Sequence, residues 1–492
     1  MIKYASLTRI FAVLSILLIA SYPLKSQETY HQLLDCFSVV AGKDATKDGS
    51  VIFAHNEDTG PNGVNYYKVP RRKHAAGEMI QLRNGGKIPQ VSETLGYIWF
   101  NIPGCDVCDS YINESGVAIG SDGCPSREDK PVLENGGIVF WLRRLVAERA
   151  TTAREGVKLA GKIIEEIGYA SSGRSYIIAD PNEAWVLTAV NGKHWAARRV
   201  ADDEVAVIAN CYTMQGIDLS DTANYMGSAD IITYATARGW YNPEKDGPFN
   251  FAKAYSNPGS LDHPGNTHRQ WRGVEIITGK KYDVNKQLPF SVKPRKRLSV
   301  RDIAEVLRDH YEGTGFDKSS MYTKGNPHKV NNATICSDGT QYCVISQLRN
   351  WLPNELAAVA WVAPFHPDIQ NYIPFYPAIT GFPAQYADGD FNDGLKKQFD
   401  PLSSRNKAPA YLKFVSLNNK VDEDFANNFP IIKKMMEKEE KTLFKQHRQF
   451  EKKAMEFLPQ LPSDRALLLT EYTTKKANTA YQKVDELINE LK

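Results

Sequence analysis

The chain has 492 residues, of which 42% are hydrophobic and 24% are charged, a composition typical of globular proteins that bury a large core. The formal net charge is only +3. This excludes the broad positive field expected of a nucleic-acid-binding protein, so no nucleic-acid partner is predicted.

The N-terminus has the layout of a secretory signal peptide. Lys3 and Arg9 precede an apolar run over residues 10–20, and small or polar residues follow up to Ser26. The run is shorter than the roughly 20 apolar residues that a membrane-spanning helix needs. We therefore predict a signal peptide over residues 1–26, no stable membrane anchor, and an exported protein that is periplasmic or extracellular.

Seven cysteines remain, an odd number that leaves at least one thiol unpaired: Cys36, Cys105, Cys108, Cys124, Cys211, Cys336 and Cys343. The spacing of Cys105, Cys108 and Cys124 could suggest zinc, but no fourth Cys or His stands nearby, so no metal site is predicted. In an oxidising compartment a disulfide within this trio, or between Cys336 and Cys343 across a hairpin, is favoured.

Taken in chain order, the first elements form a β-hairpin. Residues 37–42 and 51–54 are rich in β-branched and small residues, and a tight turn over 47–50 separates them. Antiparallel pairing would bring the stretch His55-Asn56-Glu57-Asp58 beside Cys36.

The next segments alternate between strand and helix patterns. Strands are predicted at residues 97–100, 116–120, 175–179, 184–189, 194–200 and 205–209, and helices at 138–150 and 152–167. Residues 240–295 are rich in Pro, Gly and Asn and are predicted to be mostly loop, and strand-like patterning resumes at 334–348 and 355–363. Charged amphipathic segments at 431–458 and 464–492 predict a C-terminal helical hairpin that packs on a layered α+β body.

Cys36 is the candidate for chemistry, because the zinc-protease, phosphate-loop and Gly-x-Ser-x-Gly motifs are all missing from the sequence. It could be a buried core cysteine or a lipidated one, although Leu33, Leu34 and Asp35 before it do not suit lipidation. It could also be an N-terminal nucleophile, if a pro-segment over residues 27–35 is removed. Its own α-amine, with a pKa of about 7.7–8.0, would then be the base that activates its thiol.

Several motifs, in order along residues 36 to about 420, make the chain resemble the dipeptidase A family of N-terminal-nucleophile cysteine hydrolases, to which the secernins are related. They are Cys36-x5-Gly42-x5-Asp48-Gly49-Ser50-x3-Ala54-His55-Asn56-Glu57-Asp58, then Ile112-Asn113-Glu114-Ser115-Gly116-Val117-Ala118-Ile119, His268-Arg269-Gln270-Trp271-Arg272, and Thr334-Ile335-Cys336-x4-Gln341-x5-Gln347-Leu348-Arg349.

The resemblance, extended to bile-salt hydrolases and penicillin V acylases, implies a set of roles. Cys36 would be the nucleophile, Asp58 would hold its α-amine, Asn210 would bind the substrate or the oxyanion, and Arg269 would support the site electrostatically. His55, Asn56 and Asn113 are candidate substrate-binding residues. The relatives usually have Arg where His55 stands, and the region of their further oxyanion donor falls here near Asp122-Gly123, which has no side-chain amide.

The fold implied is a four-layer αββα sandwich, with a catalytic domain over residues 36–424 and a helical extension over 425–492. The reaction implied is hydrolysis of dipeptides through a thioester, without a cofactor. The alternatives are an acylase on the same scaffold, acting on bile salts, penicillin V or N-acyl amino acids, and an exported binding protein without catalysis. The sequence leaves open whether the pro-segment is removed autocatalytically and whether the protein is a homo-oligomer.

Overall fold

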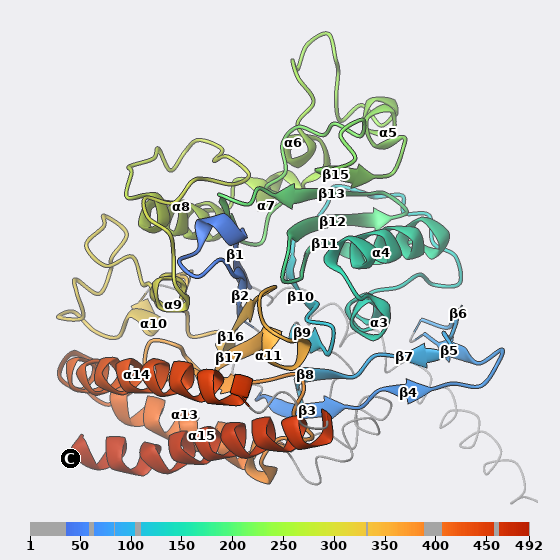
Figure 1. The fold of residues 1–492 in the computed structure, drawn as a ribbon. Helices are drawn as coiled ribbons and strands as arrows, with labels where there is room; N and C mark the ends of the chain where they lie inside the picture. The colour runs from blue at the N-terminus through green and yellow to red at the C-terminus, as the bar shows by residue number, and fades with distance from the viewer. Residues whose placement is uncertain are drawn as a thin grey trace, which may run out of the picture. The chain divides into compact units, whose positions relative to one another are not determined.

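The computed structural model describes residues 36–58, 63–82, 84–103, 110–330, 333–387, 406–456 and 462–491. The predicted signal peptide and pro-segment, together with Cys105 and Cys108, lie outside the described residues. The segment Asp35–Lys492 forms one compact unit, built as an α+β protein around two antiparallel sheets (Figure 1).

The first sheet has six strands in the order β14-β1-β2-β16-β17-β18. Its strands are β1 (Phe37–Ala41), β2 (Val51–Asp58), β14 (Val205–Ile208), β16 (Thr340–Leu348), β17 (Ala358–Ala363) and β18 (Ile373–Phe375). The predicted hairpin of β1 and β2 is confirmed, with Phe37 opposite Asn56 and Ser38 opposite His55. Both strands are buried along their whole length because they lie in the middle of the sheet and are covered on both faces.

The second sheet has eight strands in the order β15-β13-β12-β11-β10-β9-β8-β3. They are β3 (Asn65–Val69), β8 (Tyr97–Asn101), β9 (Ser110–Asn113), β10 (Ala118–Gly123), β11 (Tyr169–Ala179), β12 (Ala184–Gly192), β13 (Trp195–Val200) and β15 (Tyr225–Gly227). Two small ribbons pair β4 (Arg72–Lys73) with β7 (Glu93–Thr94) and β5 (Met79–Gln81) with β6 (Lys87–Pro89).

Helices cover the outer face of each sheet. Helices α3 (Trp141–Arg149) and α4 (Ala153–Ile167) pack on the second sheet, and α8 (Pro264–Thr278) and α9 (Val300–Leu307) pack on the first. One apolar cluster fills the space where the sheets face each other, and another lies under α3 and α4. The shorter helices are η1 (Lys43–Ala45), α5 (Ile231–Ala237), α6 (Phe251–Tyr255), α7 (Pro258–Leu261), α10 (Pro327–Val330), α11 (Asn354–Ala357) and η2 (Ala384–Tyr386).

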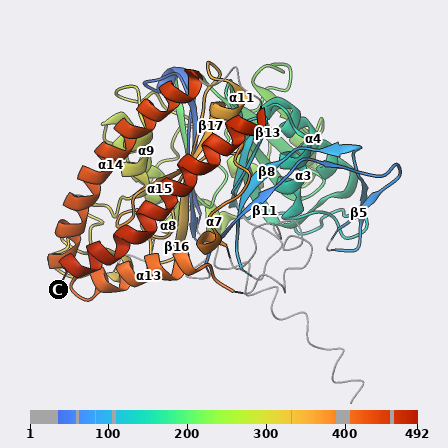
Figure 2. The same cartoon turned by 60° about the horizontal axis from the view of Figure 1, so that its bottom comes forward.

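The predicted C-terminal helices are present. Helices α14 (Phe425–Glu456) and α15 (Pro462–Glu490) lie alongside each other, and α13 (Pro409–Asp422) packs against both (Figure 2). Helix α15 also contacts β18 at the edge of the first sheet. The domain boundary after residue 424 stays a prediction. In the described part of the chain, no helix is both long and apolar enough to cross a membrane.

The expectation that residues 240–295 are mostly loop is wrong for α8. This 15-residue helix begins at Pro264, where the His263 ring accepts from the Gly265 N–H, and it ends at Gly279 with a left-handed φ of 68°. The first half of the face that it buries is polar, with Asn266, Arg269 and Gln270 among its members, so the apolar spacing that signals a helix is confined to Trp271, Val274 and Ile277.

The predicted disulfide between Cys336 and Cys343 is also wrong. Both carry free thiols, as do Cys36, Cys124 and Cys211. The partners of β16 are β2 and β17, so Cys336 and Cys343 are not paired across a hairpin. The Cys336 sulfur lies 3.5 Å from an Asp368 carboxylate oxygen, whereas the Cys343 sulfur lies 3.1 Å from the Tyr372 hydroxyl.

Candidate active site

Cys36 lies immediately before β1, beside the C-terminal end of β2. The register that sets Phe37 opposite Asn56 leaves Cys36 level with Glu57 and Asp58. The Cys36 side chain is 0% exposed, and its sulfur lies 3.8 Å from a Glu57 carboxylate oxygen. The hairpin therefore places the candidate nucleophile among acidic groups, as its sequence predicts.

A chain of polar side chains links this point to the second sheet. His55 Nε2 lies 3.4 Å from Glu57 Oε2, and His55 Nδ1 lies 3.0 Å from the Ser38 hydroxyl. Ser38 donates to Asp122 Oδ2 over 2.8 Å. Because Ser38 belongs to the first sheet and Asp122 to β10 of the second, the network spans the interface between the two sheets.

Arg269 of α8 fixes the other side of Cys36. Its Nη1 donates to the Cys36 carbonyl oxygen over 3.2 Å and lies 3.7 Å from Asp58 Oδ2, and its Nη2 donates to Asn210 Oδ1 over 2.7 Å. The Asn210 amide donates to the Gly123 carbonyl, and Asp58 Oδ1 accepts from Thr340 over 2.6 Å. The structure thus brings Cys36, Asp58, Asn210 and Arg269 together; their chemical roles stay predictions.

Asn56 and Asn113 do not join this cluster. The Asn56 amide donates to the carbonyl oxygens of Leu307 and Ile335, on the side of β2 away from His55 and Glu57. Asn113, at the end of β9, donates to two carbonyls of the segment that ends α3 and accepts from the amides of two residues in its own turn. Through these contacts both side chains hold neighbouring backbone segments in place. Their contact with substrate stays a prediction.

Burial governs the titration of the cluster. It raises the pKa of the Cys36 thiol well above its ordinary value, and the nearby carboxylates, Glu57 most, raise it further, while the Asp58 backbone amide opposes them. Burial also raises the pKa of Glu57 to about 7 and that of Asp122 to about 6. It lowers the pKa of His55 to about 4. With Cys36 in peptide linkage, the sulfur is thus a protonated thiol at neutral pH and needs a base.

Two buried arginines that the sequence analysis missed face the same network. Arg174 of β11 and Arg143 of α3 both donate to the Ser121 hydroxyl, Arg174 over 3.0 Å. Both lower the pKa of Glu57 and thereby offset part of the effect of burial. The sequence points to Asp122 only as a position where relatives would have a side-chain amide donor. In the sequence, Arg143, Arg174 and Asp122 could be found only as charged residues inside or beside a segment that is predicted to be buried.

The donor atoms of Cys36, His55 and Glu57 lie within 4.8 Å of one another, which is close enough to hold a metal ion. Three protein ligands and an open position are typical of catalytic zinc sites. An ion held here would bind the same sulfur that the sequence identifies as the nucleophile. The expectation of no metal cofactor for the reaction stays a prediction.

Comparison with known proteins places this geometry in context. Residues 129–400 match Peptidase family C69. A "Probable dipeptidase" of Latilactobacillus sakei is 30% identical over 359 residues, covering 70% of this chain and 74% of the relative. A "Probable dipeptidase" of Salmonella dublin is 28% identical over 374 residues (73% and 84%), and a "Dipeptidase" of Bifidobacterium longum is 26% identical over 393 residues (72% and 73%).

Among solved structures, penicillin V acylase of Agrobacterium tumefaciens aligns with a TM-score of 0.34 and 13% identity, over 69% of this chain and 85% of that one. A mutant of the conjugated bile acid hydrolase of Clostridium perfringens aligns with a TM-score of 0.33 and 13% identity, over 67% of this chain and 89% of that one.

The raised pKa of Glu57 makes a prediction about stability. A carboxyl group that holds its proton more tightly when folded stabilises the protein below its unfolded pKa, and this contribution is lost as the pH rises toward 7. As the pH rises from about 4.5 to about 8, the free energy of unfolding of Glu57→Gln should therefore increase relative to that of the wild type, by up to about 3 kcal/mol. Urea unfolding at both pH values measures this gain.

Glu166→Gln is the matched control, because the Glu166 side chain is exposed and forms a surface ion pair with Lys162. It should change the free energy of unfolding by less than about 0.5 kcal/mol at either pH. A stability difference between Glu57→Gln and wild type that is the same at both pH values would show that Glu57 titrates normally.

Proposed function

The chain belongs to peptidase family C69, and we propose that it is a dipeptidase whose nucleophile, Cys36, becomes the first residue when the peptide bond after Asp35 is cut. The observation that carries this proposal is the position of Cys36: it lies immediately before a central strand, buried beside Glu57, with its carbonyl held by Arg269. The family relatives named dipeptidases support the substrate class.

In the proposed mechanism, the freed α-amine of Cys36 takes the proton from the sulfur. The thiolate attacks the carbonyl carbon of the dipeptide, the amine returns the proton to the leaving nitrogen, and a thioester remains. Water then attacks the thioester with the same amine as base, the bond between carbon and sulfur breaks, the acyl part leaves as a carboxylic acid, and the amine returns the proton to the sulfur. The raised pKa of the thiol means that it needs a base to lose its proton. Because nucleophile and base belong to one residue, that base lies beside the thiol from the start.

The surrounding residues would orient this chemistry. Arg269 holds the Cys36 carbonyl and thereby fixes the direction of its α-amine and sulfur. Asp58, 3.7 Å from Arg269, is proposed to accept a hydrogen bond from the α-amine. Asn210, oriented by Arg269 and Gly123, is proposed to stabilise the oxyanion together with a backbone N–H.

We also propose that the fold is the four-layer type of the N-terminal-nucleophile hydrolases. The support is that α8 and α9 cover one sheet and α3 and α4 cover the other, while the two sheets face each other. The candidate nucleophile lies where the sheets meet.

The carboxylates nearest the Cys36 sulfur favour dipeptides with a free amino group over acylated substrates. Glu57, Asp58 and Asp122 all raise the pKa of Cys36 and therefore act on the reacting sulfur as negative charges. A substrate ammonium group is attracted to such a site, whereas a bile-acid or penicillin acyl group brings no positive charge.

The first prediction concerns the nucleophile. Active protein should begin at Cys36, as shown by N-terminal sequencing and intact mass, and Cys36→Ala should lower dipeptide hydrolysis by at least about 10⁴-fold. Cys343→Ala is the control, because its buried thiol contacts Tyr372 outside the cluster and should keep most of the activity. Full activity in protein that still carries Asp35 bound to Cys36 would contradict the mechanism.

The second prediction concerns the substrate. N-acetylation of a good dipeptide substrate should lower kcat/KM by about 100-fold, or about 3 kcal/mol, because it removes the charge that the carboxylates attract. Conjugated bile salts and penicillin V should be poor substrates in the same assay. Equal rates for free and acetylated dipeptides would favour the acylase alternative.

The third prediction concerns location. We propose that residues 1–26 direct export, on the basis of their charged start and apolar run. The full chain expressed in a bacterial host should appear in the periplasm or medium without residues 1–26, and a variant lacking residues 2–26 should stay inside the cell. Full chain that remains cytoplasmic with these residues attached would disprove export.

A further inference from the structure

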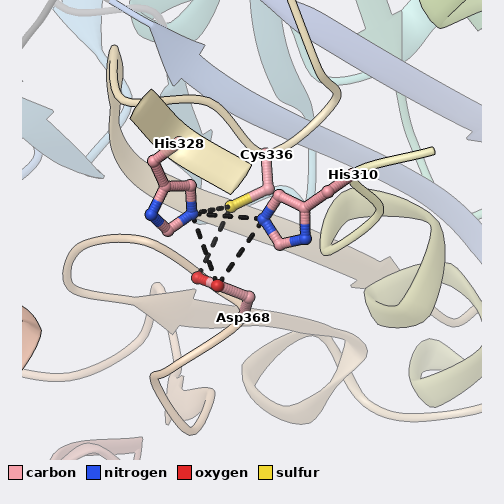
Figure 3. A group of neighbouring side chains, drawn as sticks. All are labelled: His310, His328, Cys336 and Asp368. Atoms are coloured by element: carbon pink, nitrogen blue, oxygen red, sulfur yellow. Dashed lines mark hydrogen bonds and ion pairs between the residues drawn. The ribbon is translucent and has the colours of Figure 1, made fainter. Parts of the chain in front are cut away.

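A second cluster of potential metal ligands lies outside the hydrolytic site. It consists of His310 after α9, His328 in α10, Cys336 before β16 and Asp368 between β17 and β18. Figure 3 shows the four side chains pointing toward one another. All four are between 0% and 3% exposed, and neither the hydrolytic mechanism nor a disulfide accounts for them.

Five distances within the cluster are close to those of a tetrahedral ligand set, and all the donor atoms lie within 4.8 Å of one another. With ordinary zinc bond lengths, nitrogen or oxygen ligands are about 3.3–3.4 Å apart, and a sulfur ligand is about 3.5–3.6 Å from either. His328 Nε2 lies 3.1 Å from His310 Nε2 and 3.3 Å from Asp368 Oδ2, and His310 Nε2 lies 3.6 Å from Asp368 Oδ2. The Cys336 sulfur lies 3.6 Å from His328 Nε2 and 3.5 Å from Asp368 Oδ1.

Charge and outer contacts also suit a divalent cation. A thiolate and a carboxylate neutralise two positive charges, which buries the ion without net charge. His310 directs Nε2 into the cluster while its Nδ1 lies 3.1 Å from Glu312 Oε1, and Glu312 accepts from the Tyr322 hydroxyl. A carboxylate behind a ligating histidine is the usual outer contact of zinc sites, because it fixes the ring and its tautomer.

The cluster ties together a connection that has little regular secondary structure. In the described residues between α9 and β16, the only helix is the four-residue α10. Four non-glycine residues here have left-handed φ values: Tyr311 (68°), Ser320 (50°), Met321 (56°) and Tyr322 (71°). Such backbone is costly unless the surroundings impose it. Three of the four ligands, His310, His328 and Cys336, come from this connection, and Asp368 anchors them to the first sheet.

We propose that His310, His328, Cys336 and Asp368 bind one zinc ion as a closed, structural site. Four protein ligands leave no position for substrate, which distinguishes structural from catalytic zinc. A cavity of about 310 Å³, lined among others by Asp368, Glu312 and Tyr322, gives the ion a path from solvent.

The site acts on the hydrolytic cluster through the backbone that it holds. The Asn56 side chain binds the carbonyls of Leu307 and Ile335, at the two ends of the same connection. Thr340, four residues beyond Cys336, donates to Asp58. Zinc therefore fixes the segment that positions Asp58, without touching the reacting atoms.

The test is the metal content of full-length protein purified without chelators or metal-affinity resin, measured by inductively coupled plasma mass spectrometry. About one zinc per chain is expected. Cobalt exchanged into the protein should show tetrahedral d–d bands and a thiolate-to-metal charge-transfer band. The Cys336→Ala variant should lose the charge-transfer band and bind zinc more weakly by more than about tenfold, because the loss of an outer contact to a ligand alone typically costs that much.

Two controls separate this site from the others. Cys36→Ala should keep the zinc and the charge-transfer band, which excludes the Cys36, His55 and Glu57 group, and Cys343→Ala should keep both as well. If Cys336→Ala does not fold, chelation of wild-type protein decides: the melting temperature should fall and should recover with zinc. Protein that holds no zinc after purification and after reconstitution under reducing conditions, or zinc lost in Cys36→Ala, overturns the proposal.

Discussion

The whole Cys36 cluster depends on holding charged groups in a place from which water is excluded. Three carboxylates, Glu57, Asp58 and Asp122, surround a sulfur that is fully buried. Buried charges are tolerated only when other charges and hydrogen bonds compensate them. The arginines that do so come from separate elements, Arg269 from α8, Arg143 from α3 and Arg174 from β11. The site can therefore form only when both sheets and the helices on both of their outer faces are assembled.

This requirement explains which parts of the site can be predicted from the sequence. The hairpin of β1 and β2 is local, so strand patterning and a turn are enough to place Asp58 beside Cys36. Asp122, Arg143 and Arg174 reach the site through contacts between layers that no local pattern encodes. Arg269 is found only through resemblance, because the part of the helix that carries it buries polar side chains and the apolar spacing is confined to Trp271, Val274 and Ile277.

The cysteines also show that local sequence patterns do not predict contacts between distant segments. The spacing of Cys336 and Cys343 suggests a disulfide, but the neighbours of Cys336 are His310, His328 and Asp368, at separations along the chain that fit no short zinc motif. The ligands converge because the connection from α9 to β16 folds back on itself and Asp368 reaches it from beyond β17. The tetrahedral spacing of these donors exists only in three dimensions, which is why sequence patterns predict a disulfide here and no metal.

The same burial gives the uncleaved and cleaved chains different chemistry in the proposed mechanism. While Asp35 is joined to Cys36, burial and three carboxylates keep the sulfur as a thiol, and the peptide nitrogen cannot accept its proton. Cleavage creates an amine next to that sulfur, inside the region from which water is excluded. The ammonium that forms on proton transfer then lies beside the carboxylates that had opposed the thiolate, and they stabilise it. An environment that suppresses a lone thiolate can thus favour the thiolate–ammonium pair, because the carboxylates repel the thiolate but attract the ammonium, and the pair carries no net charge.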